Sequence, residues 1–210
     1  MRIRTKRFVA TFAGLVMLGV LAHTAVSQDK PEKAAAPAGG PDPKMMAEMM
    51  KMNAPGEQHA LLKRMAGTFD GEVAIKMAAD APEMKTKGRE TSEMILGGRF
   101  LKTDYSGDMM GMPFKGMQLQ GYDTFKKKYV SVWVDSMNNG VMTAEGTADA
   151  AGKVISFSGE YADPMAGGKL KQYRQVLTIT DDDHHEFEML EKGDDGKEFR
   201  GLYIKYTRAK

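Results

Sequence analysis

Cysteine is absent from this chain of 210 residues. The absence excludes disulfide bridges and thiolate metal sites, so the protein must be stabilised by the packing of a core. Roughly 150 residues follow the N-terminal segments described below, and a domain of that size buries about two-thirds of the surface of its unfolded chain. We therefore expect one domain with an adequate core.

Familiar catalytic motifs are also missing. The sequence contains no P-loop, no Gly-x-Ser-x-Gly and no His-Glu-x-x-His. On a strand, His184 and His185 would face opposite sides and could not readily chelate one metal ion. His184 would share a face with Glu186 and Glu188, which we interpret as a solvated charged face, with a weak divalent-ion site as the alternative. We interpret His59 as a helix-surface or capping residue.

One apolar run stands at the N-terminus. MRIRTKR supplies four positive charges before FVATFAGLVMLGVLA, a run of roughly 15 apolar or small residues where a bilayer span needs about 20. This pattern predicts a secretory signal peptide over residues 1–27 with cleavage after Ser27, and an uncleaved N-terminal anchor is the alternative. No cysteine follows the run, which excludes a lipoprotein anchor. We expect a periplasmic or secreted protein without a membrane span after cleavage.

The chain shows no excess of charge that would attract nucleic acid. Removing residues 1–27 takes away four of the 30 basic residues and none of the 28 acidic ones, which leaves a net charge of −2. Nucleic-acid-binding domains present a basic stripe or patch, and this chain has neither. Nucleic acid is therefore excluded as an expected partner.

Residues 28–54 are expected to be a flexible linker. Its first part, QDKPEKAAAPAGGPDPK, is rich in Pro, Ala, Gly and charge without apolar periodicity, so it cannot bury enough surface to offset the entropy of ordering. Its second part contains MMAEMMKM, residues 45–52, which can form a short helix. The domain proper is expected over residues 55–210.

A helix over EQHALLKRMA opens the domain and places Leu61, Leu62 and Met65 on one face. After Gly67, short β-prone runs alternate with turn residues. The strands are expected near residues 68–78, 85–96, 98–107, 114–124, 128–136, 140–148, 153–161, 169–180, 184–192 and 198–207. Consecutive hairpins of this kind predict an all-β fold, an antiparallel up-and-down barrel of about ten strands preceded by a short helix.

The stretch YVSVWVDS contains the only tryptophan of the chain. Strand alternation puts Trp133 and Asp135 on one face and valines on the other. If the valines fill the core, Trp133 lies outside. If the Trp133 face points inward, the interior is aromatic and polar, and the helix or a partner must cover the valines. Trp133 is then either a core aromatic whose N–H finds a partner while Asp135 opens a turn, or part of a cavity lining.

Methionine is abundant, with 19 residues. Thioethers are soft ligands that select Cu(I), and Met46, Met49 and Met50 would lie on one helical face. Methionine is also an ordinary filler of irregular apolar surface, so packing or docking on a partner is our main interpretation. The three residues remain weak candidates for Cu(I), and no other metal site or cofactor is expected.

Several segments together resemble the family called domain of unknown function 1579 (DUF1579). They are HALLKRMAGTF, ILGGRFL, PFKGMQLQGYD, YVSVWVDS and YIKYTR, and the resemblance spans roughly residues 57–208. The family has no established activity. The resemblance implies a β-rich domain of the lipocalin-like barrel type.

Lipocalins begin their first strand with Gly-x-Trp, and an arginine at the end of the last strand packs over that ring. Gly67, Thr68, Phe69 and Arg208 have similar places in this chain. Phe69 replaces the tryptophan, so a cation–π or stacking contact can still form but is weaker. The chain thus departs from the lipocalin pattern at this position.

These observations favour an exported, non-enzymatic barrel that binds a small apolar or amphipathic molecule, near whose mouth the loop Gly111–Pro113 lies. Three alternatives stay open: a filled structural or interaction protein, a Met-rich periplasmic Cu(I)-binding protein, and an enzyme acting on a lipid-like or phenolic compound. For the enzyme, Asp123, Asp135 and Arg174 are the acid or base candidates. The candidate ligand-binding residues are Tyr105, Tyr122, Asp123, Trp133, Asp135 and Arg174. The sequence leaves the oligomeric state open.

Overall fold

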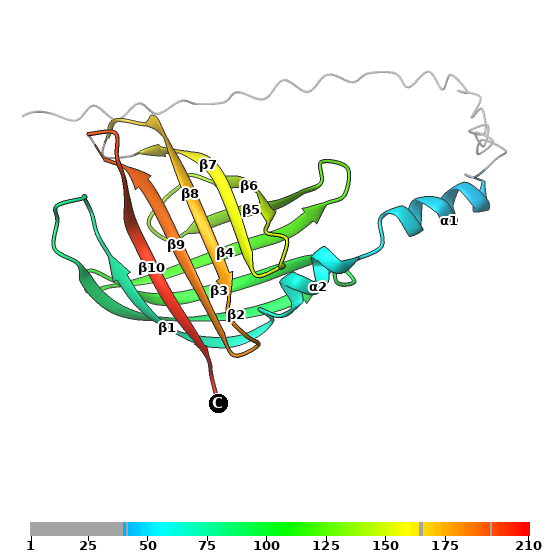
Figure 1. Ribbon diagram of the computed structural model, residues 1–210, viewed down its shortest axis with the longest axis horizontal. Helices are drawn as coiled ribbons and strands as arrows, with labels where there is room; N and C mark the ends of the chain where they lie inside the picture. The colour runs from blue at the N-terminus through cyan, green and yellow to red at the C-terminus, as the bar shows by residue number, and fades with distance from the viewer. Residues whose placement is uncertain (1–39, 41, 164–165, 194) are drawn as a thin grey trace, which may run out of the picture. The chain divides into compact units, whose positions relative to one another are not determined.

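A computed structural model describes residues 40, 42–163, 166–193 and 195–210. Helices α1 (Pro43–Met52) and α2 (Glu57–Lys63) precede ten strands (Figure 1). The strands are β1 (Gly67–Ile75), β2 (Met84–Ile95), β3 (Phe100–Met109), β4 (Met112–Asp123), β5 (Lys128–Asp135), β6 (Met142–Ala148), β7 (Val154–Asp163), β8 (Lys169–Ile179), β9 (His184–Lys192) and β10 (Glu198–Arg208). The expected signal peptide, with its cleavage site after Ser27, lies outside the described residues.

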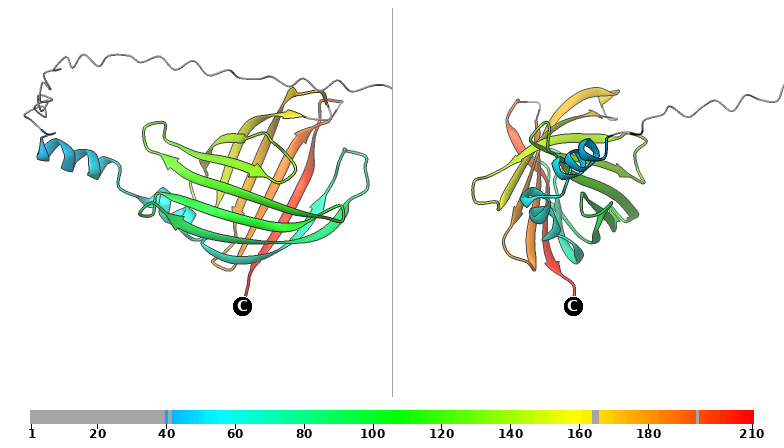
Figure 2. Two further views of the ribbon diagram at one scale, coloured as in Figure 1. Left: turned by 180° about the vertical axis from the view of Figure 1, so that it is seen from behind. Right: turned by 90° about the vertical axis from the view of Figure 1, so that its right-hand side faces the viewer.

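Each strand pairs antiparallel with the next along the chain, and β10 pairs with β1, so the sheet closes into a barrel. The two views in Figure 2 show this closure from behind and from one side. The prediction of an all-β, up-and-down barrel of about ten strands preceded by a short helix is confirmed.

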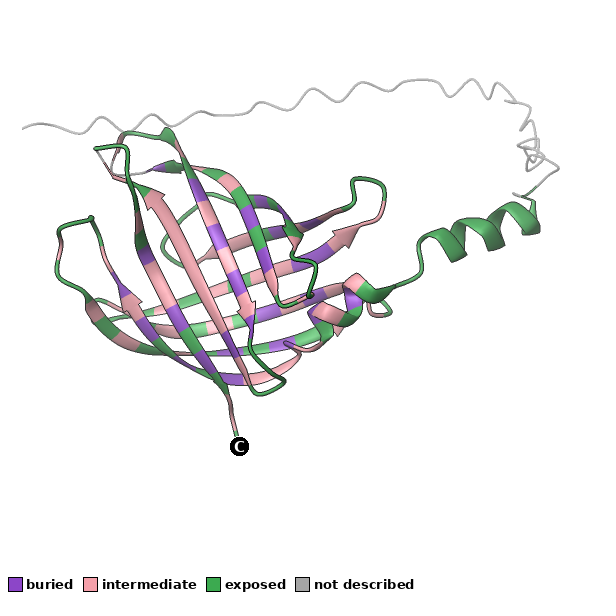
Figure 3. Cartoon of the chain, in the orientation of Figure 1, coloured by how far each residue is buried: buried purple, intermediate pink, exposed green. Residues whose placement is uncertain are grey.

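Burial alternates along most strands, as period-two geometry requires (Figure 3). In β1, for example, Phe69 and Val73 are buried while Asp70 and Glu72 are exposed. Because β1 is paired on both sides, its buried face is the face that points into the barrel. Residues paired on neighbouring strands point to the same side of the sheet, so the register assigns the inward and outward residues of all the remaining strands.

Inward glycines make room for aromatic rings on neighbouring strands. Gly146 of β6 pairs with Phe157 of β7, and Gly159 of β7 pairs with Tyr173 of β8. A Cβ on Gly146 would lie 2.8 Å from the Phe157 ring, and one on Gly159 would lie 2.7 Å from the Tyr173 hydroxyl. Because glycine has no side chain, Gly146 and Gly159 leave room on the inner wall for the neighbouring rings.

Helix α2 packs its apolar face into one end of the barrel. Leu62 of α2 and Met65, in the connection that follows the helix, are buried with the barrel residues Leu101 and Ile155. The helix ends at Lys63, earlier than the expected stretch EQHALLKRMA. At the start of the helix, the side chain of His59 acts as a cap: its Nδ1 accepts a hydrogen bond from the backbone N–H of Gly56 at 3.0 Å. Of the two expectations for His59, the structure shows the capping residue and not a surface residue, since its side chain is buried. Burial, reinforced by the charge of Arg99, lowers its pKa.

Arg208, at the end of β10, stacks on the ring of Phe69 in β1. Its Cζ lies 4.4 Å from the ring centroid, so the contact implied by the lipocalin pattern is present with phenylalanine in place of tryptophan. Gly67 permits this approach. A Cβ there would lie 2.2 Å from Arg208 Nη1, and the φ of 134° is itself one that favours glycine.

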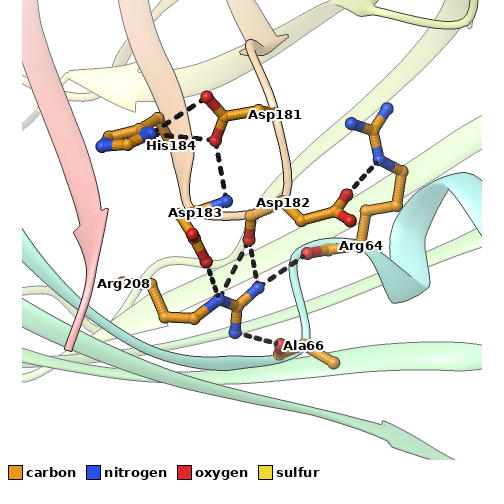
Figure 4. Close-up of polar contacts among 7 residues, drawn as sticks. All are labelled: Arg64, Ala66, Asp181, Asp182, Asp183, His184 and Arg208. Carbon is orange, nitrogen blue, oxygen red and sulfur yellow. Dashed lines mark hydrogen bonds and ion pairs between the residues drawn. The ribbon is translucent and has the colours of Figure 1, made fainter. Parts of the chain in front are cut away.

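The same guanidinium ties the α2–β1 connection to the β8–β9 loop (Figure 4). Arg208 Nη1–H donates to the Ala66 carbonyl at 3.0 Å, and Nε–H donates to Asp183 Oδ1 at 2.9 Å. Arg208 also donates to the carbonyls of Arg64 and Asp182. Arg64 Nε–H in turn donates to Asp182 Oδ1 at 3.0 Å. We call this set of contacts the Arg208 clasp.

Adding a methyl group at Gly159 should destabilise the barrel. In Gly159→Ala the new Cβ would meet the Thr143 carbonyl oxygen at 2.3 Å, and backbone cannot move aside cheaply, so we expect a loss of about 1–3 kcal/mol. The measurement is urea unfolding followed by circular dichroism. Gly140→Ala is the control, since nothing lies within 4 Å of its Cβ position. Equal stabilities of the two variants would contradict the packing account.

Replacing Arg208 with lysine should weaken the clasp even though the charge is kept. Lysine lacks the planar fork that stacks on Phe69 and bonds several oxygens at once, so Arg208→Lys is expected to cost about 1–3 kcal/mol of unfolding free energy. In the control Arg174→Lys, only an outer ion pair with Glu198 changes, and the cost should stay below about 1 kcal/mol. A similar loss of unfolding free energy in both variants would show that the Arg208 clasp stabilises the protein no more than the outer ion pair does.

Candidate functional site

The structure decides which way the Trp133 face points. Tyr129 and Ser131 of β5 are 3% and 4% exposed, whereas Val132 is 36% exposed. Because side chains alternate across a strand, Trp133 and Asp135 share the inward face with Tyr129 and Ser131. The valines of this strand therefore lie on the outer face.

An aromatic cluster lies on the inner wall where β3, β4 and β5 run side by side. The ring centroids of Tyr105 and Phe114 are 5.9 Å apart, and each lies 6.3 Å from that of Trp133. Gly116 provides the space for the indole, since a Cβ there would lie 2.2 Å from two of its ring carbons. All three aromatic residues are partly exposed. We call Tyr105, Phe114 and Trp133 the aromatic cluster.

Asp135 holds the tryptophan in place. Trp133 Nε1–H donates to Asp135 Oδ2 at 3.0 Å, and the backbone N–H of Met137 donates to Asp135 Oδ1 at 2.9 Å. Two sequence expectations are thus confirmed: the indole N–H has a partner, and Asp135 opens the turn after β5. Both oxygens of this carboxylate therefore accept hydrogen bonds from the chain itself.

Deeper in the barrel, a carboxylate is paired with an imidazole. Glu90 Oε1 lies 3.0 Å from His185 Nε2, and their side chains are 10% and 4% exposed. Tyr206 also hydrogen-bonds Glu90, and burial raises its pKa well above the ordinary value, so the phenol acts as the donor. The His185 ring stacks on Tyr206 at 4.5 Å and meets the edge of Phe69 at 4.6 Å.

Further polar groups line the same interior. Ser92 Oγ lies 2.7 Å from Thr103 Oγ1, and Gln118 Nε2–H donates to Ser131 Oγ at 3.1 Å. Gln175 is 5% exposed, and its Oε1 has no hydrogen-bond partner in the described part of the chain. We give the name polar band to the following set of inward polar residues: Glu90, Ser92, Thr103, Gln118, Gln120, Ser131, Gln175 and His185.

Four of the six predicted ligand-binding residues face inward, but they divide between two places. Tyr105, Trp133 and Asp135 lie together around the aromatic cluster. Tyr122 lies near α2, where its ring centroid is 5.1 Å from that of Tyr129 and 6.2 Å from that of His59.

The other two predicted residues lie elsewhere. Asp123 Oδ1 accepts the backbone N–H groups of Phe125 and Lys126 in the β4–β5 turn. Arg174 lies on the outer face, because its neighbours Tyr173 and Gln175 take the inward positions of β8. Its Nη2 forms an ion pair with Glu198 at 2.9 Å. The acid and base candidates Asp123, Asp135 and Arg174 are therefore not brought together.

Sequence reasoning missed Glu90 and Gln175, although alternation marks both. Lys85, Lys87 and Arg89 occupy every second position of β2 and identify its solvated face, which leaves Glu90 on the inner one. Gln175 likewise alternates with the buried Tyr173 and Leu177.

A cleft of about 440 Å³ lies at the α2 end of the barrel. Glu57, Gln58 and Leu61 of α2 form one side, and Tyr122 and Tyr129 of the inner wall are also part of its lining. The remaining lining residues come from the β4–β5 and β6–β7 turns and the adjoining part of β6: Lys127, Thr147, Ala148, Asp149, Ala150 and Gly152. Tyr122 is partly exposed at this cleft, whereas Tyr129 is only 3% exposed.

The weak metal candidates lie in two places. Met46, Met49 and Met50 lie on α1, which buries none of its residues. His184 Nδ1 lies 2.8 Å from Asp181 Oδ1 on the outside of the barrel. Among the described residues, no group of three or more His, Asp or Glu side chains is placed to hold a metal ion. None of the described helices is long and apolar enough to cross a membrane.

Comparisons with known proteins agree with this architecture. A family model described as "Protein of unknown function (DUF1579)" matches residues 54–208. The crystal structure of Rv2717c from M. tuberculosis is similar at a TM-score of 0.55 with 14% sequence identity, over 75% of this chain and 100% of that one. At this identity the similarity shows the fold alone. No curated relative matches the sequence.

Buried tyrosines should make the protein sensitive to alkali. Burial raises the pKa of Tyr105, Tyr129 and Tyr173 to about 12, against about 10 in an unfolded chain. Between these values the folded chain holds protons that the unfolded chain has released. Their stabilising contribution is therefore complete below about pH 10 and is lost as the pH rises through about 12.

Urea unfolding between about pH 9 and about pH 12 measures this loss, with phenolate absorbance followed in parallel. Tyr129→Phe should flatten part of the pH dependence, which separates the tyrosines from the lysines that titrate in the same range. Phenols that ionised normally in the folded protein would contradict the prediction.

Proposed function

The chain belongs to the DUF1579 family of proteins of unknown function, and from that premise we propose that it is an exported, non-enzymatic barrel that binds a small amphipathic molecule. The molecule occupies the interior between the aromatic cluster and the polar band. Its apolar part lies against Trp133 and Phe114, and its hydrogen-bonding part faces Gln175.

The observation that supports this proposal best is the unpartnered amide oxygen of Gln175. A buried polar atom without a partner costs free energy, and native proteins satisfy the great majority of such atoms. Tyr173 and Leu177 show that the neighbouring inward positions of β8 hold larger or apolar side chains. A glutamine at this position is therefore better explained by a bound donor group than by packing.

The polar band as a whole supports the same interpretation. A barrel filled only for stability would use apolar residues, since each buried polar group must be matched by a partner. Here β2 to β5 present Ser92, Thr103, Gln118, Gln120 and Ser131 on the inner wall. Ligand sites commonly combine apolar walls with a few fixed polar groups of this type.

The aromatic cluster gives the interior an apolar contact surface. Its three rings are partly exposed, so they offer area to a ligand without having to leave the core. The β3–β4 turn lies next to the cluster, and the exposed side chains of Met110 in the turn and Met112 at the start of β4 are adaptable in shape. We propose that the ligand enters past this turn, beside Gly111 and Pro113.

Charge pairing restricts the class of ligand. Glu90 is already matched by His185 and Tyr206, and Asp135 by Trp133 and Met137. On the inner face of β7 to β9, Asp163 forms an ion pair with Lys171 at 2.6 Å, and Glu191 Oε2 accepts a hydrogen bond from the Tyr161 hydroxyl at 3.0 Å. The polar-band groups that remain for a ligand are neutral amides and hydroxyls. We therefore expect an uncharged hydrogen-bonding head, such as an alcohol or a phenol, on an apolar body.

Binding should change the fluorescence of Trp133 and should depend on Gln175. We expect 1-decanol or 1-naphthol to shift the emission saturably. In Gln175→Leu, affinity should fall at least about tenfold, because a head-group hydrogen bond is lost. Folding stability should be unchanged or higher, because an unmatched buried amide is replaced by a side chain of similar size.

Gln172→Leu is the matched control, since Gln172 lies on the outer face of the same strand. A filled structural barrel predicts no response from Trp133 with either compound and equal behaviour of both variants. Native mass spectrometry of gently purified protein adds an independent readout. An extra mass that is lost on denaturation would support binding, and a bare chain that is silent to both probes would refute it.

A further inference from the structure

The inward orientation of Trp133 leaves an apolar surface on the outside of the barrel. On this outer side of β4 and β5, Leu119 pairs with Val132 and Met117 pairs with Val134. Met117 is 42% exposed and Val132 is 36% exposed. We call the following residues the outer apolar face: Phe100, Met117, Leu119, Val130, Val132 and Val134.

Polar side chains border this face on both sides. On β3, Lys102 and Asp104 form an ion pair at 2.6 Å opposite Leu119 and Met117. On β6, Glu145 lies opposite Val130 and pairs with Lys126 at 2.6 Å. An exposed apolar strip with a polar border is typical of a surface that another element covers.

Helix α1 also exposes apolar side chains. Five of its ten residues are methionine, and none of its residues is buried. An isolated helix shorter than about 12 residues is marginal in water, because helices in proteins gain most of their stability by packing an apolar face. Met49 lies in the middle of the methionine side, with Met46 and Met52 one turn away on either hand.

The two surfaces match in size and lie within reach of one another. A helix of ten residues is about 15 Å long, and the strand from Val130 to Val134 extends about 13 Å. Only residues 53–56 separate α1 from α2. Within that linker, Pro55 Cγ would lie 3.8 Å from a Cβ on Gly98. Phe100, at the border of the outer apolar face, is two residues further along.

From these observations we infer that α1 packs against the outer apolar face of its own chain, with its methionines over the valines of β5. The short linker favours this partner over a second copy, because it holds α1 at a high local concentration next to the surface. The inference is independent of what the barrel binds.

The absence of cysteine allows a direct test in the full chain. Met49→Cys combined with Val132→Cys should form a disulfide within one chain under mild oxidation. Met49→Cys combined with Lys205→Cys is the control, since Lys205 is exposed on the outside of β10. We expect the first pair to close at least about tenfold faster than the second, independently of protein concentration.

Three results are possible in this experiment, and each decides the question once circular dichroism shows that both variants are folded. A fast intramolecular bond in the first pair alone supports the inference. A covalent dimer of the first pair overturns it in favour of a second copy. Equal rates for both pairs overturn it altogether.

Methionine oxidation gives a second readout that needs no cysteine. The helix α1 by itself leaves Met49 46% exposed, close to the 55% of Met110 in the β3–β4 turn. If α1 packs on the outer apolar face, dilute peroxide should oxidise Met49 several-fold more slowly than Met110. Val132→Asp should abolish the difference by placing a charge in the contact. Equal oxidation of Met49 and Met110 in the unmodified chain would refute the packing of α1.

Discussion

The pairing of β10 with β1 brings Arg208 opposite Phe69 and leaves no strand in the described sheet with an unpaired edge. Closure removes the exposed edges through which long antiparallel sheets associate. It also gives every strand one enclosed face, so the side-chain parity of a single strand fixes the parity of all the others through the register. The Arg208 clasp reinforces this seam and joins it to the connection that follows α2.

Once parity is fixed, the interior must accommodate whatever lies on the inner face, including large rings and charged groups. Rings are accommodated by glycines on neighbouring strands, as with Trp133 over Gly116 and Tyr173 over Gly159. The buried carboxyl group of Glu90 is accommodated by His185 and Tyr206. Burying one member of such a group without the others would be strongly unfavourable. Gln175 is the described exception, and this is why the proposed ligand is placed beside it.

The same parity explains the outer surface. Because Trp133 and Ser131 of β5 point inward, the valines of that strand point outward. The neighbouring strand β4 adds Leu119 and Met117 to the same outer side. An interior of aromatic and polar side chains and an exposed apolar exterior are thus two consequences of one orientation. The inferred packing of α1 gives the exterior a cover made of methionines, whose flexible side chains suit an irregular surface of valines.

The sequence by itself determined the fold class, the number of strands and the opening helix, because turn residues and period-two alternation are local signals. It also indicated the Phe69 and Arg208 contact through the lipocalin pattern. The direction of the Trp133 face could not be predicted, since both faces of YVSVWVDS are compatible with burial. Only closure of the sheet decided it. For the same reason Glu90 and His185, about 95 residues apart in the chain, could be recognised as a pair only in the folded structure, because pairing distant residues depends on strand register.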